Sequence, residues 1–438
     1  MTSIERSVPT GRPPDARTLS VQLVADGLDF PTGLAFLADG RLAVAEAGLP
    51  FGGARPGGRI RLIDPGGHPT TLADGLPWPV TGLTPLGDSL IISVPGALLR
   101  TRLDGTVEPL LEGLPRGGNY HTNHVAAGPD GWLYFGQGAM TNSGVVGLDG
   151  DDLGWLRRHD HPADVPGLDI RLAGLTYPTA DPTDPRSMIS TAAFSRFGET
   201  RPPVSRLPGR LPCTAAVLRC RPDGTELELV AWGTRNPYGL AFLPDGRLLA
   251  VDQGPDDRGS RPIGNAPDLL YEIRPGAWYG WPDFVGGDPV TAPWLRPERG
   301  EPPGFLLDHA TLPPPEPALL RFPPHVAATR LAVGPEQSTS WADRLLVTLF
   351  GDERPLTAPA GPSVGRCLAA IDLNRGTISP LITDPLLRPI DVGFSPTDGS
   401  PYVVDFGRFE MGPAGAVDAS PGTGRIWRVV DHTEGVSE

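Results

Sequence analysis

The sequence contains no lysine, since all 37 of its basic residues are arginine. A chain without lysine cannot form a Schiff base with a carbonyl substrate and cannot use a lysine as its general base. This absence excludes one class of covalent chemistry before any motif is considered.

Cysteine is also scarce. Cys213, Cys220 and Cys367 are the only cysteines, too few for a disulfide framework. Cys213 and Cys220 could pair, but the favoured interpretation is that all three are buried free thiols. No Cys/His spacing typical of a metal site occurs in the chain.

Long apolar runs are missing as well. No run is long enough to span a membrane, and residues 1–20 (MTSIERSVPTGRPPDARTLS) lack the apolar core of a signal peptide. The net charge of −14 argues against nucleic acid or an anionic membrane as a partner. We therefore expect a soluble protein that acts on a small molecule. It would be cytoplasmic as it stands, or periplasmic or extracellular if the chain is already processed. The sequence leaves its oligomeric state open.

Turn-forming residues are abundant, and they punctuate a repeated unit. The chain holds 57 glycines and 54 prolines, yet 39% of its residues are hydrophobic, which favours many short strands joined by turns. The unit is a strand, a turn that usually contains Asp-Gly, and a second strand, as in PTGLAFLADGRLAVAE. Its copies are 31–46, 80–94, 121–137, 239–252, 325–349 and 388–405. A further short strand follows each copy, at 59–64, 98–105, 217–224, 269–276, 367–376 and 425–430.

Six copies of such a unit predict an all-β fold, a six-bladed β-propeller with long Pro-rich loop insertions. We expect one domain over 21–431, with insertions at 145–212 and 286–317. The first insertion is expected to form a partly ordered cap beside the mouth of the central channel. Residues 1–20 are expected to be a disordered lead and 432–438 a tail. Because loops between blades converge at one end of the channel, residues at the ends of units should face a common site.

The densest chemistry lies in 233–284, at the ends of such strands. Arg235-Asn236 opens this stretch, where a fixed charge and an amide precede a proline. Gln253-Gly254-Pro255-Asp256-Asp257 follows a strand that is apolar on both faces and therefore expected to be buried. This second segment is rich in backbone and carboxylate oxygens, which are ligands of the kind that calcium takes.

Four motifs together resemble the glucose/sorbosone dehydrogenase family. They are HTNHVAAGPDGWLYFGQG from His121, GTRNPYGLAFLPDGRL from Gly233, DQGPDD followed by LLYEIRPGAWYGWPDF, and RPIDVGFSPTDG from Arg388. The resemblance covers nearly the whole chain after about residue 25. It implies a six-bladed propeller that holds pyrroloquinoline quinone (PQQ) and calcium at the channel mouth and oxidises a sugar or another alcohol or aldehyde.

The resemblance also implies roles for individual residues. His121 would be the catalytic base, a function that suits histidine near neutral pH. Residues matched to cofactor binding are Arg235, Asn236, Gln253, Arg388 and, in place of the family's fifth-blade lysine, Arg354. Residues matched to calcium binding are Gly254, Pro255, Asp256 and Asp257. His124, which could instead point into its blade, and Asp268 are two further candidates.

Other interpretations of the same residues stay open. His121 could simply bond a neighbouring carbonyl, and Arg235 could form a salt bridge with Asp256 at the start of its blade. The family's lysine is absent here, and Ile390 stands where some members carry a second last-blade arginine. Two alternative functions follow: a propeller enzyme that catalyses hydrolysis or a rearrangement without PQQ, or a non-catalytic ligand-binding propeller.

Overall fold

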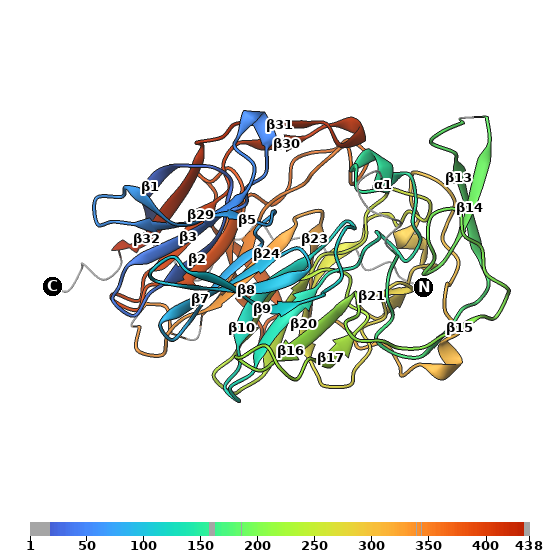
Figure 1. The fold of residues 1–438 in the computed structure, drawn as a ribbon, viewed down its shortest axis with the longest axis horizontal. Coiled ribbons are helices and arrows are strands. Elements are labelled where there is room, and N and C mark those ends of the chain that lie inside the picture. Colours follow the sequence, from blue (N-terminus) through green and yellow to red (C-terminus); the bar gives the residue numbers. More distant parts are fainter. Residues whose placement is uncertain (1–17, 157–162, 185, 339, 343, 433–438) are drawn as a thin grey trace.

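Six four-stranded antiparallel sheets form the body of the molecule in the computed structural model (Figure 1). The structure describes residues 18–156, 163–184, 186–338, 340–342 and 344–432. The innermost strands contact one another in the closed order β2, β6, β10, β18, β24, β28 and back to β2. The prediction of a six-bladed β-propeller is therefore confirmed.

Each blade consists of four strands rather than the three that the repeat indicates. The blades are β2 (Pro31–Phe36), β3 (Leu42–Glu46), β4 (Gly58–Ile63) and β5 (Pro69–Leu76); β6 (Gly82–Leu86), β7 (Ser89–Val94), β8 (Ala97–Arg102) and β9 (Val107–Glu112); β10 (Thr122–Ala127), β11 (Leu133–Gln137), β16 (Ala216–Cys220) and β17 (Glu228–Trp232); β18 (Pro237–Phe242), β19 (Leu248–Asp252), β20 (Pro267–Ile273) and β23 (Leu320–Pro324); β24 (Ala328–Val333), β25 (Leu345–Leu349), β26 (Cys367–Asp372) and β27 (Thr377–Ile382); and β28 (Pro389–Phe394), β29 (Pro401–Asp405), β32 (Gly424–Asp431) and β1 (Leu19–Leu28).

The last blade combines both ends of the chain. Strand β1 pairs antiparallel with β32, from Leu19 opposite Asp431 to Leu28 opposite Gly424. This pairing couples the first strand of the chain to the last and closes the ring of blades. The predicted lead and tail lie outside the described residues at 1–17 and 433–438, and β1 begins within the predicted lead.

Local chemistry explains the turns within the blades. In the fourth blade, Gly246 has a φ of 87°, which glycine adopts without strain. The preceding Asp245 accepts a hydrogen bond from the backbone N–H of Arg247 at 3.1 Å. The same arrangement recurs at Asp39 with Arg41. The Asp-Gly pair in the repeat is therefore the residue pair that closes each of these turns.

The second strand of a blade is the most buried one. All five residues of β3, β11, β19 and β25 are buried, as the apolar runs predict. All three cysteines are free and buried, which agrees with the sequence-based expectation. The core therefore lies between adjacent blades, around these strands.

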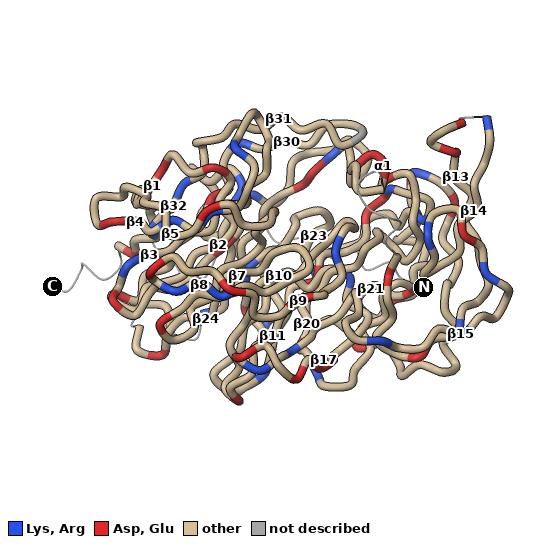
Figure 2. The backbone as a smooth tube through the Cα atoms, viewed as in Figure 1, with Lys and Arg blue, Asp and Glu red and all other residues tan. Residues whose placement is uncertain are grey.

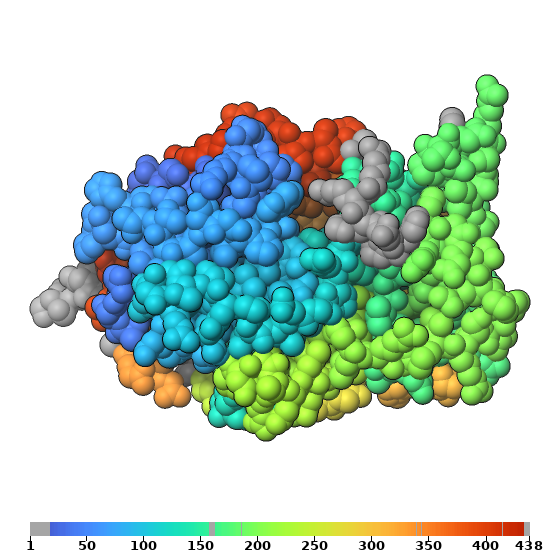
Figure 3. Space-filling view, viewed as in Figure 1, coloured from blue at the N-terminus to red at the C-terminus, as the bar shows by residue number. Residues whose placement is uncertain are grey.

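The two insertions build a separate region at one side of the propeller. Between β11 and β16 the chain forms α1 (Asp149–Asp152), β12 (Ile170–Arg171), β13 (Thr176–Ala180), β14 (Met188–Ala192) and β15 (Arg206–Leu207). Between β20 and β23 it forms β21 (Phe284–Val285), β22 (Asp288–Pro289), η2 (Pro293–Leu295) and η3 (His309–Thr311). Figures 1 and 3 show β13 and β14 projecting at the right-hand edge, beyond the blades.

Short segments complete the fold. They are η1 (Phe51–Gly53), β30 (Phe409–Met411), η4 (Pro413–Gly415) and β31 (Val417–Ala419). Acidic and basic residues are interspersed along the chain rather than gathered on one face of this view (Figure 2). In the part of the chain that the structure describes, no helix combines the length and apolar character needed to cross a membrane.

Candidate active site

A cavity of about 320 Å³ lies where the blades meet, and His121 is part of its wall. The cavity is lined from blade two by Thr81, from blade three by His121 and Asn123, from blade four by Asn236 and Gln253, from blade five by Thr329 and from blade six by Ile390. These residues stand at the starts of strands, just before them or, in the case of Gln253, just after the end of one. The structure therefore brings together residues that lie up to about 300 positions apart in the sequence, as a propeller channel requires.

A row of side-chain amides crosses one wall of this cavity. The Nδ2 of Asn123 donates to the Oδ1 of Asn236 at 2.8 Å, and the Nδ2 of Asn236 donates to the Oε1 of Gln253 at 2.8 Å. Gln253 in turn donates from its Nε2 to the carbonyl oxygen of Ala328 at 3.2 Å. Each amide is held in one orientation by the next, which makes this wall a fixed polar surface.

Arg235 lies directly behind the amide row and is 2% exposed. Its guanidinium pairs with Asp256 at 2.8 Å and donates to the carbonyl oxygen of Gly254 at 2.6 Å. It also donates to the Tyr120 hydroxyl and lies 4.4 Å from the centre of that ring. The salt bridge with Asp256 considered from the sequence is thus present, and it does not remove Arg235 from the site. Arg235 lines a recess of about 70 Å³ that shares Tyr120, Gln253 and Asp256 with the main cavity.

The start of blade four is fixed by a buried carboxylate. Asp252, the last residue of β19, accepts hydrogen bonds from the backbone N–H groups of Arg235 at 3.0 Å and Asn236 at 2.6 Å. Burial raises the pKa of Asp252 to about 7, against the effect of these two N–H groups. This contact positions the Arg-Asn pair at the channel mouth.

Three of the four residues matched to calcium binding are engaged within the protein. The Gly254 carbonyl accepts from Arg235, and the Asp256 carboxylate contacts both Arg235 and Arg258. The Asp257 carboxylate accepts the backbone N–H groups of Glu298 and Arg299, which anchors the second insertion. Pro255 follows Gly254 in the same segment. Over the described residues, no group of three or more His, Cys, Asp or Glu side chains is arranged to hold a metal ion.

Charges around Asp256 decide its ionisation. Burial alone would favour the neutral acid, but Arg235 and Arg258 outweigh it and hold the pKa of Asp256 below its ordinary value. Arg258 also pairs with Asp149 of α1 at 2.5 Å. Asp256 is therefore an anion that ties two arginines together on the floor of the cavity.

Arg388 and Arg354 are the two other arginines predicted to bind the cofactor, and neither lines the cavity or its recess. Arg388 is 1% exposed, donates to the carbonyl oxygens of Asp352 and Phe409, and pairs with Glu410 at 2.7 Å. Arg354 donates to the carbonyl oxygen of Pro362 at 2.7 Å. Both side chains are therefore bonded to groups of the protein in the arrangement that the structure shows.

His124 and Asp268 have structural partners. His124 is buried within its blade, with its Nε2 3.3 Å from the hydroxyl of Thr84, and burial lowers its pKa well below the usual range. Asp268 accepts the backbone N–H groups of Gly254 at 2.9 Å and Ala328 at 2.7 Å, and burial raises its pKa to about 6. Asp268 lines the recess and joins blades four and five, whereas His124 points into the blade.

Several cavity residues carry no motif in the sequence and were missed. Glu353, rather than its neighbour Arg354, lines both the cavity and the recess. Burial raises the pKa of Glu353, with Asp256 adding to the effect. Tyr120 and Arg258 lie beside predicted residues in the chain, and this adjacency is the one signal that could have identified them. His325, which lines the recess, opens a predicted repeat but has no motif of its own.

The fold and the site together define a six-bladed propeller with a polar cavity at the mouth of its channel. Residues 219–302 match the family described as Glucose / Sorbosone dehydrogenase, so the resemblance is confirmed over this stretch. Quinoprotein glucose dehydrogenase B of Acinetobacter calcoaceticus is 39% identical over 64 residues, which cover 15% of this chain and 12% of that protein.

Two solved structures share the fold over nearly the whole chain. A glucose dehydrogenase-type oxidoreductase of Thermus thermophilus superposes with a TM-score of 0.54 at 21% identity, over 94% of this chain and all of the other. The PQQ-bound aldose sugar dehydrogenase of Streptomyces coelicolor gives a TM-score of 0.55 at 18% identity, over 95% and 99% of the two chains. At these identities the similarity establishes the fold.

Proposed function

We propose that the channel mouth oxidises a sugar or another alcohol, with PQQ as electron acceptor and His121 as base. One observation carries this proposal: His121, Asn236 and Gln253, which come from three separate motifs, line a single cavity. The family match over residues 219–302 and the sugar dehydrogenases that share the fold support the same activity.

The residues present fit a planar, polar cofactor. The cavity volume of about 320 Å³ is in the usual range for small-molecule sites, and the row Asn123–Asn236–Gln253 offers a fixed polar wall. The Nδ2 of Asn119, another lining residue, is buried without a hydrogen-bond partner among the described residues. A buried amide donor of this kind favours a ligand with acceptor oxygens.

The charge of the cavity lining also affects how well PQQ would bind, because PQQ carries carboxylates. Arg235 and Arg258 supply positive charge at the cavity floor, where bidentate pairing with carboxylates favours arginine. Asp256 partly neutralises them, and Glu353 faces the same cavity. Burial raises the pKa of Glu353, so this carboxylate takes up a proton at a higher pH than an exposed one and repels an anionic cofactor less as the pH falls.

When bound, the quinone would supply the two-electron acceptor that alcohol oxidation needs. His121 would hold the substrate hydroxyl and accept its proton. The carbon atom bonded to that hydroxyl could then give up a hydride. Asn123 and Asn236 would orient the substrate and the cofactor through their fixed amides. Tyr238 and Ile390 form less polar parts of the wall and would exclude water.

Calcium does not fit the arrangement in the same way. A cation at Gly254 would compete with Arg235 for the carbonyl oxygen, and the carboxylates of Asp256 and Asp257 already have partners. The arrangement therefore supports no catalytic step through calcium. Its binding at Gly254 and Pro255 remains a prediction of the family resemblance.

A second candidate function is catalysis without PQQ. The pairing of Arg235 with Asp256 and of Arg388 with Glu410 favours it, because both arginines already have carboxylate partners. His121 with Asp256 and Glu353 would then serve hydrolysis or a rearrangement. A third candidate, a non-catalytic binding propeller, would use the same polar wall without any chemistry.

Sugar-dependent dye reduction separates these candidates. Purified protein loaded with PQQ in the presence of calcium should reduce a redox dye when an aldose is added, and His121→Ala should abolish the reaction. Activity that persists without PQQ and is lost in His121→Ala would support the second candidate. Ligand binding that is unchanged in both His121→Ala and Asn236→Ala would contradict any role for this cavity.

A further inference from the structure

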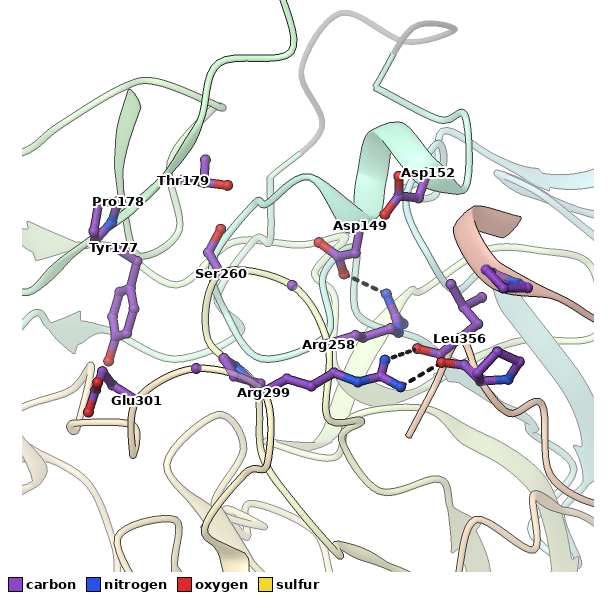
Figure 4. A pocket seen from close by; sticks show the side chains of 15 residues that line it. Asp149, Asp152, Tyr177, Pro178, Thr179, Arg258, Ser260, Arg299, Glu301 and Leu356 are labelled. Atoms are coloured by element: carbon purple, nitrogen blue, oxygen red, sulfur yellow. Dashed lines mark hydrogen bonds and ion pairs between the residues drawn. The ribbon is translucent and has the colours of Figure 1, made fainter. Parts of the chain in front are cut away.

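A second cavity, of about 760 Å³, lies beside the channel mouth (Figure 4). Its walls come from the two insertions, with Tyr177 and Thr179 of β13, Asp149 and Asp152 of α1 and the segment around Glu301, and from the loop between β19 and β20 that contains Ser260. Arg258 and Leu356 line this outer cavity and the channel-mouth cavity alike. The two cavities therefore adjoin at Arg258 and Leu356.

The outer cavity is lined by groups that suit a neutral, hydroxyl-rich ligand. Tyr177 contributes an aromatic ring, while Ser260 and Thr179, which lie near each other on one side of the cavity, contribute hydroxyl groups (Figure 4). The Oγ of Ser260 is buried and has no hydrogen-bond partner within the described residues. A hydroxyl can both donate and accept, so this atom can bond a ligand hydroxyl in either sense.

The charges of the outer cavity disfavour an anionic ligand. Arg258 is paired with Asp149, and Arg299 donates both ends of its guanidinium to the carbonyl oxygens of Pro355 and Leu356. Glu301, by contrast, has no ion-pair partner in the described part of the chain and is exposed on the cavity rim. Carboxylates accept hydrogen bonds from hydroxyl groups and repel anions. The Glu301 carboxylate therefore favours a polyol over a phosphate or a carboxylate as the ligand.

We propose that the outer cavity is a second subsite, which binds the additional sugar units of an oligosaccharide whose terminal sugar reacts at His121. This inference rests on the proposed function, since it assigns the reacting sugar to the channel mouth. It gives the insertion at 145–212 a role: the insertion selects substrates longer than one sugar. Arg258 stands at the junction, held by Asp256 on one side and Asp149 on the other.

Calorimetric titrations of the PQQ-loaded protein with glucose, maltose and maltotriose test the subsite. We expect maltotriose to bind more tightly than glucose. Glu301→Gln and Ser260→Ala should each weaken maltotriose about three- to tenfold, as the loss of one hydrogen bond implies, and leave glucose unchanged. Glu298→Gln, an exposed change on the same loop outside the cavity, is the matched control and should alter neither affinity.

The outcomes separate the subsite from the proposed function. Glucose binding that depends on Asn236 without any gain for maltotriose would overturn the subsite alone. Equal losses for all three sugars in Glu301→Gln would also overturn it. If Glu301→Gln slowed dye reduction equally for every sugar without changing sugar affinity, the cavity would be a docking site for the electron acceptor instead. No sugar binding to any variant or to the wild type would contradict the proposed function itself.

Discussion

Arg235 and Asp256 form an ion pair of 2.8 Å beneath the channel-mouth cavity. The pair joins the residue that opens blade four to the loop that follows the second strand of that blade. Arg235 is 2% exposed, so its charge depends on this carboxylate and on the carbonyl oxygens around it. The ion pair stabilises the fold and also positions a residue of the site, because Arg235 lines the recess beside the amide row.

Removing Arg235 should destabilise the protein. Arg235→Ala leaves Asp256, whose side chain is 14% exposed, with Arg258 as its one ion-pair partner among the described residues, and we expect the free energy of unfolding to fall by about 3 kcal/mol. Urea denaturation followed by fluorescence measures this change. Arg247→Ala, which removes the exposed pair with Asp245, is the control and should change stability little. A loss no larger than that of the control would show that the buried pair contributes nothing measurable.

The two histidines of the HTNH motif should behave differently. His121→Ala should lower sugar oxidation by about 10²- to 10⁴-fold, as expected for loss of a general base, with little change in melting temperature. His124→Ala should lower the melting temperature because it leaves a gap within the blade, and it should reduce activity less. Steady-state kinetics and thermal unfolding of both variants test this, with the exposed His68→Ala as control. Equal activity losses in both variants would contradict the assignment of His121 as base.

Asp268 should make the fold less stable as pH rises from about 4 to about 6. Its pKa is raised to about 6 in the folded protein, so the folded state binds more protons than the unfolded state between these values. Stability contributed by the protonated acid is complete below about pH 4 and is lost as pH rises toward 6. Melting temperatures of the wild type and Asp268→Asn across this range measure the effect. We expect a shallower decline in the variant, and identical slopes would remove Asp268 as a cause.

Glu353 should oppose cofactor binding at high pH. Because its pKa is raised, lowering the pH converts it to the neutral acid and should strengthen PQQ binding. Glu353→Gln should bind PQQ at least as tightly as the wild type and with a weaker pH dependence. Fluorescence titrations at several pH values measure both quantities. Weaker binding in Glu353→Gln would indicate that this carboxylate holds the cofactor instead of repelling it.

The repeat predicts the inner three strands of each blade but not the fourth. Strand β5, for example, alternates poorly between buried and exposed positions, and its sequence PTTLADGL resembles a loop. The pairing of β1 with β32 could not be predicted either, because no local pattern reports a contact between residues about 400 positions apart. Long-range closure depends on the whole ring, not on the strand itself.

The sequence predicted cavity residues best where a polar motif residue lies next to the end of a predicted strand. His121, Asn236 and Gln253 have such positions, and all three line the cavity. Glu353 was missed because it lies in the segment GDERP, where no periodicity indicates which of two adjacent charged residues faces inward. The structure places Glu353 on the cavity wall and directs Arg354 to Pro362.

Titration of the purified protein with PQQ, with and without calcium, tests the central claim most directly. Quinone absorbance and thermal stability report binding, and Asn236→Ala is compared with Asn374→Ala, an exposed residue outside the site. The account predicts saturable binding that stabilises the wild type and Asn374→Ala and is weakened at least tenfold in Asn236→Ala. Absence of binding to the wild type, with or without calcium, would contradict the account and leave the cavity to chemistry that needs no quinone.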